Sequence, residues 1–200
     1  MAENIKENRP LDEVIKEFEG LPEAARAELI NGEIFLQAAA ASGHQFVETN
    51  LTGLLVAEMR NRRKSGNDGG GSDNYWRISV EQGIFYDKKN RFLHDLVAWK
   101  SEKMPQAPAE NFCKTLPDFV CEVVSTNAFN DYVRKYKVLR ENSIPYYWIV
   151  TYKEDKSLKV LEYHDGDYQE ELTIDENNKG PLLLKPFGIE ISFDDVFDGI

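Results

Sequence analysis

Three ionisable side chains could do chemistry in this chain, and each lies in a segment with a strand or helix pattern. Glu122 stands inside PDFVCEVVS (117–125), Asp95 inside FLHDLVAW (92–99), and Lys135 in the helix that follows Glu122. Burying an unpaired carboxylate is costly, so an acid in the core of a strand usually has a partner or a function. Two carboxylates that meet in a sheet repel each other, and a hard divalent cation such as Mg²⁺ relieves that repulsion. A nearby ammonium would complete a site for phosphoryl chemistry.

Strand geometry decides which acid can be the partner of Glu122. Successive residues of a strand face opposite sides, so Asp118 and Glu122 share a face, but they lie about 13 Å apart along the strand, too far to bind one ion. The second carboxylate must therefore come from another strand, and Asp95 is the best candidate. Alternation places Asp95 on one face with Leu93, Val97 and Trp99. Asp118 follows a proline at a strand start, which favours a structural role.

The ammonium is expected from the helix after Glu122. Tyr132, Tyr136 and Leu139 form the stripe that should pack on the sheet, and Lys135 lies beside it. Lys137 is a local competitor, and periodicity alone does not choose between the two lysines. A lysine in either position could also be a solvated helix residue, the usual fate of this side chain.

Apolar periodicity and turn residues predict the elements that must position these side chains. The predicted helices are Leu11–Leu21, Ser42 to about Arg63, and about Ala128 to Asn142. The predicted strands are a hairpin over Ala27–Leu36 around Asn31-Gly32, then Tyr75–Tyr86, Phe92–Lys100, Phe119–Val124, Tyr146–Tyr152, and a second hairpin of Leu158–Tyr163 with Tyr168–Leu172. Residues 64–74 and 101–116 are predicted loops, and a short tail ends the chain.

The order of these elements indicates an α+β fold. A strand, a helix and a strand between Phe119 and Tyr152 form a βαβ unit, whose strands should be parallel and whose crossover should be right-handed. We predict a mixed central sheet flanked by helices. The chain is expected to form a single domain over 1–200, with a core of about 27–152 and a C-terminal β extension of about 153–200.

Composition limits the classes of function. The 200 residues carry 24 basic and 35 acidic side chains, a net charge of −11, which counts against a protein that coats DNA through phosphate neutralisation. A metal-dependent nuclease stays compatible, because its site is acidic. No apolar run approaches the roughly 20 residues that span a membrane, and the N-terminus lacks the apolar region of a secretory signal. Two cysteines are too few for a disulfide framework or a zinc site. We expect a reduced, cytoplasmic protein without a membrane partner.

Several segments carry a family resemblance. They are AELINGEI (27–34), GHQFVETNL (43–51), the Asp95 strand, PDFVCEVVS, and the run from Asp131 through Lys135 to IPYYWIV (144–150). Over about Ala27 to Thr151 the chain resembles a restriction-endonuclease-like family of the PD-(D/E)XK nuclease superfamily. The resemblance implies a restriction-endonuclease-like core and a site that hydrolyses DNA phosphodiester bonds with Mg²⁺ or Mn²⁺.

The resemblance also implies roles for individual residues. Asp95 and Glu122 would bind the metal ion and Lys135 would assist hydrolysis, since Val124 occupies the usual E-x-K lysine position and the family's register favours Lys135 over Lys137. Glu28 aligns with a recurrent early glutamate and would be a further metal ligand. The chain departs from the family pattern at three positions, which are His94, Tyr146 and Thr151.

Two positions keep open alternatives. His44, near a helix start, could contact substrate, although a surface or capping role is favoured. The basic run from Arg60 to Lys64 could touch phosphates, but cations at a helix C-terminus also complement its dipole, and that interpretation is favoured.

We predict a Mg²⁺-dependent endodeoxyribonuclease, with a homodimer expected from function alone. The alternative is a non-catalytic binding or scaffold module with the same fold, and a small-molecule hydrolase using the same metal is a third class for which no residue pattern argues. A compact acid–acid–lysine cluster would favour the enzyme. A cluster that is splayed apart or occupied by internal salt bridges would favour the module.

Overall fold

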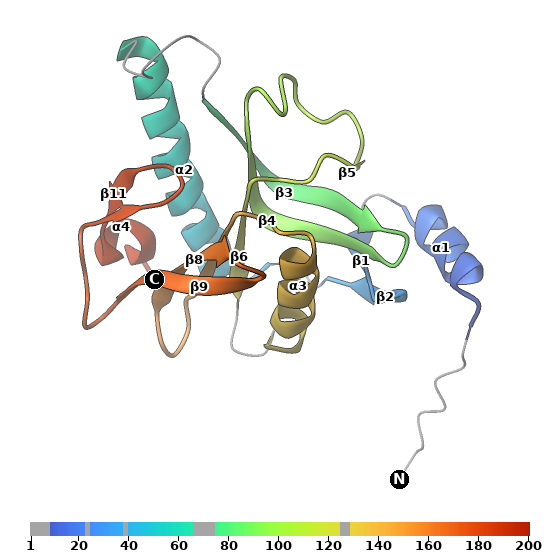
Figure 1. Ribbon diagram of the computed structural model, residues 1–200. Coiled ribbons are helices and arrows are strands. Elements are labelled where there is room, and N and C mark those ends of the chain that lie inside the picture. The colour runs from blue at the N-terminus through green and yellow to red at the C-terminus, as the bar shows by residue number, and fades with distance from the viewer. Residues whose placement is uncertain (1–8, 23–24, 38–39, 66–74, 125–128) are drawn as a thin grey trace.

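The computed structural model describes residues 9–22, 25–37, 40–65, 75–124 and 129–200. A nine-stranded mixed sheet forms its centre, with helices packed on both faces (Figure 1). The helices are α1 (Leu11–Gly20), α2 (Ser42–Ser65), α3 (Phe129–Glu141) and α4 (Phe193–Phe197). The predicted α+β class with a mixed sheet is confirmed. Within the described ranges, no helix is both long and apolar enough to cross a membrane.

The strands of the large sheet follow the order β2-β1-β4-β6-β7-β8-β9, and β3 pairs with β4 and β5. Their bounds are β1 (Ala27–Ile30), β2 (Glu33–Leu36), β3 (Trp76–Asp87), β4 (Asn90–Lys100), β5 (Phe112–Cys113), β6 (Phe119–Val124), β7 (Tyr146–Thr151), β8 (Ser157–His164) and β9 (Asp167–Asp175). Strand β6 precedes α3 in the sequence and β7 follows it. As predicted, the two strands pair in parallel, with Glu122 opposite Ile149. The sheet therefore places Glu122 in a central strand.

Strand β6 is buried on both faces, which explains its nearly continuous apolar sequence. Phe119, Cys121 and Val123 pack in the same cluster as the α2 residues Val47, Leu51 and Leu55. Val120 packs on the opposite face, in a cluster with Leu139 of α3. Glu122 is thus the acid on the α3 face of a buried strand, as alternation predicts.

Strand β4 departs from the predicted alternation at Asp95. Phe92 packs with Val138 of α3, whereas Leu96, an even number of residues later, packs in the α2 cluster. The partner strand changes at the same level: Val80 pairs with Leu96, Gln82 pairs with His94, and Glu81 between them has a φ of 51°. A positive φ in a non-glycine residue interrupts the regular strand conformation, and the alternation of side chains between the two faces of the sheet is reversed there. The prediction that Asp95 shares a face with Val97 and Trp99 is therefore wrong, and Asp95 turns toward α2.

Two regions contain structure that the sequence pattern did not predict. The short strand β5 lies within the predicted loop 101–116 and pairs in parallel with β3. The predicted tail forms a separate two-stranded sheet, β10 (Leu182–Leu184) with β11 (Ile189–Ile191), followed by α4. A capping box between Ser192 and Asp195 starts α4. Most of the predicted loop 64–74 lies outside the described residues.

Candidate active site

The polar side chains of the candidate site gather where β4 and β6 separate. The two strands pair from Leu96–Cys121 to Ala98–Phe119. Beyond that point the carboxylate of Asp95 occupies the space between them, and its Oδ2 accepts a hydrogen bond of 2.7 Å from the backbone N–H of Val123. The Asp95 carboxylate takes the place of a backbone carbonyl of β4, so the buried N–H of Val123 keeps a hydrogen-bond partner. Asp95 is therefore anchored next to Glu122 through the backbone of β6.

The first group of side chains is centred on Lys135. Its Nζ lies 2.8 Å from Oε1 of Glu28 and 3.3 Å from both carboxylate oxygens of Glu122. It also donates a 3.1 Å hydrogen bond to the carbonyl of Leu93, whose own N–H donates to Glu28 at 2.8 Å. All three ionisable residues are buried. One ammonium thus lies between two carboxylates contributed by β1 and β6.

The charges of this group are strongly coupled. Burial opposes the charge of Lys135, but the carboxylates of Glu122 and Glu28 outweigh it and raise the pKa of the ammonium. Burial raises the pKa of Glu122 to about 8, against the attraction of Lys135. The charges of Asp95 and Glu28 act in the same direction as burial. Lys135 therefore stays protonated at neutral pH, while Glu122 resists ionisation.

His94 connects this group to the interior of the sheet. Its Nδ1 contacts Oε1 of Glu122, and its Nε2 lies 2.8 Å from the hydroxyl of Tyr86. Burial, and next the charge of Lys135, lower the pKa of His94 to about 3, so the ring is neutral. A neutral ring carries one N–H, and both contacts are satisfied if Nδ1–H donates to Glu122 and Nε2 accepts from Tyr86. His94 therefore orients the Glu122 carboxylate.

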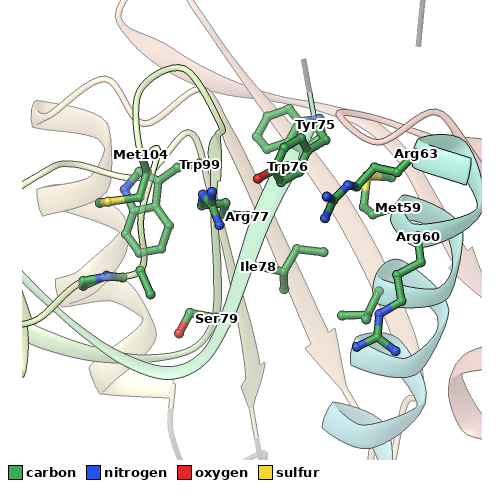
Figure 2. A pocket seen from close by; sticks show the side chains of 13 residues that line it. Met59, Arg60, Arg63, Tyr75, Trp76, Arg77, Ile78, Ser79, Trp99 and Met104 are labelled. Carbon is green, nitrogen blue, oxygen red and sulfur yellow. The ribbon is translucent and has the colours of Figure 1, made fainter. Parts of the chain in front are cut away.

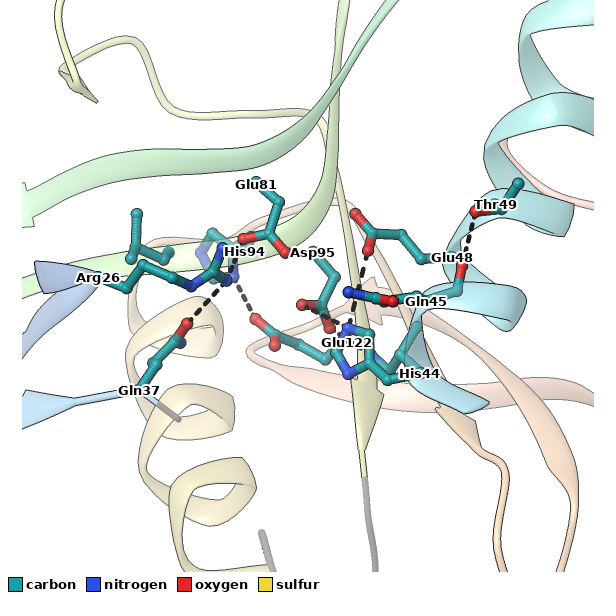
Figure 3. Close-up of polar contacts among 12 residues, drawn as sticks. Arg26, Gln37, His44, Gln45, Glu48, Thr49, Glu81, His94, Asp95 and Glu122 are labelled. Atoms are coloured by element: carbon teal, nitrogen blue, oxygen red, sulfur yellow. Dashed lines mark hydrogen bonds and ion pairs between the residues drawn. The ribbon is translucent and has the colours of Figure 1, made fainter. Parts of the chain in front are cut away.

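The second group of side chains lies on the α2 side of Asp95 (Figure 3). Oδ1 of Asp95 is 3.2 Å from Nε2 of His44, in the first turn of α2. Glu81, from the irregular point of β3, completes a set in which one potential ligand atom of each residue lies within 4.8 Å of the others. Arg26 forms an ion pair with Glu81 and also donates to Gln37 at 3.3 Å. Asp95 is buried, whereas His44, Glu81 and Arg26 are only partly buried, so this side of the site lies nearer to solvent.

Electrostatics at this second group reflect an excess of carboxylates. Burial lowers the pKa of His44, but the hydrogen-bonding and charge effects of Asp95 outweigh it and raise the value. Burial raises the pKa of Glu48 to about 7, and the charges of Glu81 and Asp95 act in the same direction. Nε2 of His44 is buried, and within the described part of the chain it makes no well-formed hydrogen bond despite its contact with Asp95. A cation held by Asp95, Glu81 and His44 would use this nitrogen and offset the carboxylate charges.

Comparisons with known proteins identify the family of this chain. The model of the Uma2 family, described as "Putative restriction endonuclease", matches residues 15–194. The chain belongs to the Uma2 family. A solved structure titled as a putative nuclease belonging to DUF820, from Anabaena variabilis ATCC 29413, covers 92% of this chain and 96% of its own, with a TM-score of 0.70 and 16% sequence identity. The chain shares the fold of that solved structure. No curated protein matches the chain. Membership of the Uma2 family indicates a nuclease.

Within this Uma2 fold, the residues predicted from sequence fall into the two groups. Lys135, Glu122 and Glu28 are in direct contact, whereas Asp95 contacts His44 and the Val123 backbone instead. Lys137 lies on the exposed side of α3, 3.8 Å from Glu141, so the lysine beside the acids is Lys135. Asp118 accepts hydrogen bonds from the Lys100 N–H and the Lys103 ammonium, in agreement with a structural role.

Sequence reasoning missed three residues of the candidate site. These are His94, Glu81 and Arg26. A signal existed for His94, because a histidine inside the apolar run FLHDLVAW needs a polar partner when buried. Glu81 gave no such signal, since regular alternation does not foresee the reversal of β3.

Proposed function

We propose that this chain is a metal-dependent endonuclease that hydrolyses phosphodiester bonds in DNA. The observation that carries the proposal is the buried Lys135 ammonium held by two carboxylates, next to a separate Asp95–Glu81–His44 set that could hold a cation. Phosphodiester hydrolysis needs positive charge where negative charge develops, and a fixed ammonium beside a cation supplies it. Family membership supports the same reaction class.

The donor set fits a divalent ion of intermediate hardness. Asp95 and Glu81 offer oxygen ligands and His44 offers a ring nitrogen. Mg²⁺ prefers oxygen donors and keeps several waters, whereas Mn²⁺ accepts carboxylate and imidazole together, so we expect Mn²⁺ to bind more tightly. When bound, such an ion polarises a phosphate oxygen and lowers the pKa of a bound water. Asp95 is the proposed central ligand because its other oxygen is fixed by Val123.

Glu122 and Glu28 are proposed to position the lysine. Both were expected from family resemblance to bind metal, but their oxygens contact Lys135, and His94 also orients Glu122. The raised pKa of Lys135 keeps its positive charge available at neutral pH. In this assignment the two acids hold the ammonium close to the phosphate, and Asp95 holds the ion.

A non-catalytic binding module is the second candidate, and the internal salt bridges of Lys135 with Glu28 and Glu122 favour it, by the criterion stated from the sequence. An ammonium has three N–H donors, and the contacts of Lys135 with Glu28, Glu122 and the Leu93 carbonyl account for three. The lysine must give up one of these contacts to reach a phosphate. A chain in which that exchange never occurs would bind nucleic acid without turnover.

Cleavage and metal binding measured on the same variants separate these assignments. Supercoiled plasmid is incubated with the protein and Mg²⁺, Mn²⁺ or EDTA, and Mn²⁺ binding is followed by calorimetry. Asp95→Asn should lose both Mn²⁺ binding and cleavage. Glu122→Gln should keep Mn²⁺ binding but slow cleavage about 10²-fold or more, as loss of a transition-state contact does. Glu141→Gln, an exposed acid on α3, is the matched control and should behave as the wild type.

Each contrary result has a definite meaning. Cleavage that persists unchanged in Asp95→Asn and Glu122→Gln would exclude this site. Mn²⁺ binding without cleavage by the wild type would support the binding module. Loss of Mn²⁺ binding in Glu122→Gln would contradict the positioning role and return Glu122 to the set of ligands.

A further inference from the structure

A second feature lies beside the candidate site, between the later turns of α2 and the first half of β3. It is a pocket of about 340 Å³, lined by side chains of both elements and of the segment after β4 (Figure 2). Three of its lining residues are arginines: Arg60 and Arg63 from α2, and Arg77 from β3. Figure 2 shows the side chains of Arg63 and Arg77 on either side of Ile78, with Arg60 one turn of α2 away from Arg63. The Tyr75 ring is in contact with the guanidinium groups of both Arg63 and Arg77.

Among the described residues, none of the three arginines forms an ion pair with a carboxylate. Arg62, their neighbour on α2, differs: it pairs with Glu58 at 2.8 Å and donates to the carbonyls of Phe187 and Gly188. The chain has a net charge of −11, so three cations around one pocket that lack an acidic partner in the described residues favour the binding of an external anion.

Arg77 gives this reasoning an independent basis. The dipole of α2 accounts for basic residues at its C-terminal end, but Arg77 belongs to β3. One guanidinium nitrogen donates to the carbonyl of Pro105, while the Nε is buried and has no hydrogen-bond partner in the described part of the chain. The Arg77 and Arg63 guanidinium carbons lie 5.2 and 4.7 Å from the centre of the Tyr75 ring, which holds both groups at the pocket. A buried donor without an acceptor suits an oxyanion ligand.

The pocket and the candidate site share strand β3. Arg77 and Ser79 line the pocket, and Glu81 of the Asp95–Glu81–His44 set is the next residue but one. Four residues of strand separate Arg77 from Glu81, or about 13 Å. A strand of B-DNA advances about 3.4 Å per nucleotide along the helix axis, so a few nucleotides are enough to span that distance. A single nucleic-acid strand could therefore occupy both places.

We infer that the Arg60–Arg63–Arg77 pocket binds backbone phosphates of the DNA strand whose scissile bond lies at the Asp95–Glu81–His44 set. The position of the scissile bond at the Asp95–Glu81–His44 set rests on the proposed nuclease function. Binding of phosphates by the pocket does not require catalysis. Contacts from guanidinium groups to phosphates position a strand without reading its sequence. The pocket thus gives an acidic protein a local cationic surface for substrate, independent of base identity.

The test measures binding in the absence of cleavage. A fluorescein-labelled duplex oligonucleotide is titrated with protein in EDTA and separately in Ca²⁺, and anisotropy is followed over a range of salt concentrations. Arg60→Ala, Arg63→Ala and Arg77→Ala should each weaken binding about fivefold, and the slope of log K against log salt should fall by about 1 per arginine removed. Arg77→Lys retains the charge, so its salt slope should stay near the wild-type value. Lys137→Ala, an exposed lysine on α3, is the matched control.

The outcomes distinguish this inference from the proposed function. Weaker binding with a smaller salt slope in the alanine variants, equal for unrelated oligonucleotide sequences, supports the pocket whether or not the protein cleaves DNA. Unchanged binding and slope in variants with wild-type thermal unfolding would overturn it, even if metal-dependent cleavage is observed. Absence of oligonucleotide binding by the wild type in both buffers would also overturn it and direct the search to an acidic protein partner.

Discussion

The Lys135 ammonium is surrounded more completely than a single ion pair requires. Two carboxylates and a backbone carbonyl lie within 3.3 Å of its Nζ, and the residue is 5% exposed. A buried charge is tolerated only when its partners are close and well placed. The two acids depend on the lysine in turn, because neither Glu28 nor Glu122 has much access to water. The three residues therefore stabilise the fold only as a set.

Replacing Lys135 should expose that dependence. Lys135→Met leaves the buried acids Glu28 and Glu122 without their cation, so we expect a loss of about 3–5 kcal/mol in the free energy of unfolding, as for other broken buried ion pairs. Lys137→Met removes a lysine from the same helix, but its partner Glu141 is exposed and the change should stay within about 0.5 kcal/mol. Urea denaturation at neutral pH measures both. Equal stability of the two variants would contradict the described Lys135 environment.

The residue-level prediction from sequence succeeded where regular geometry holds. Glu122 faces α3 as strand alternation requires, and Lys135 lies on the face of α3 that meets it. It failed at Asp95, because the alternation changes opposite Glu81, a residue with a positive φ. A local reversal of this kind depends on contacts between distant strands, so periodicity within one segment does not reveal it.

At the scale of elements, β3 depends on a glycine at its contact with β5. Gly83 pairs with Phe112 in the parallel β3–β5 ladder. A Cβ added at Gly83 would lie 2.2 Å from the carbonyl oxygen of Asn111 and 2.8 Å from the Phe112 ring. The backbone of β5 could not reach its place beside a larger residue. The sequence predicted β3 but not β5, since two residues are too few to show a strand period and their pairing is set by a distant glycine.

Gly83→Ala should therefore destabilise the protein, although alanine is normally the better residue in regular structure. We expect a loss of about 1–3 kcal/mol, the usual cost of forcing atoms into a packed region. Gly53→Ala is the matched control: Gly53 is exposed in the interior of α2 with no atom within 4 Å of an added Cβ, so the change should stabilise by about 0.5–1 kcal/mol. Thermal and urea unfolding measure both. Stabilisation by both substitutions would show that β5 does not pack on Gly83.

At the scale of the whole molecule, the end of the chain completes the α2 side of the core. In Figure 1, α4 and β11 lie beside α2, and the side chain of Asn50 on α2 donates to the carbonyls of Val196 and Asp198. Phe187, between β10 and β11, packs against Trp76, Phe119 and Trp148 with ring centroids 4.8–5.7 Å apart. The sequence predicted only a short tail here, because these elements are brief and acquire their order from a surface formed by distant residues.

That arrangement makes the stability of the β4–β6 region depend on residues far from it in sequence. Phe187 is 1% exposed and contacts Phe119 of β6, the strand that carries Glu122. Phe187→Ala should create a cavity and cost about 3–5 kcal/mol of unfolding free energy. Leu183→Ala removes a side chain from β10 that is 63% exposed, so its cost should be within about 0.5 kcal/mol. Urea denaturation compares the two, and hydrogen exchange at Val123 reports on β6. If the C-terminal segment were an accessory to an independent core, Phe187→Ala would leave global stability and Val123 exchange unchanged. A large loss of stability with faster Val123 exchange would instead establish that the segment helps to hold the strand that positions Asp95 and Glu122.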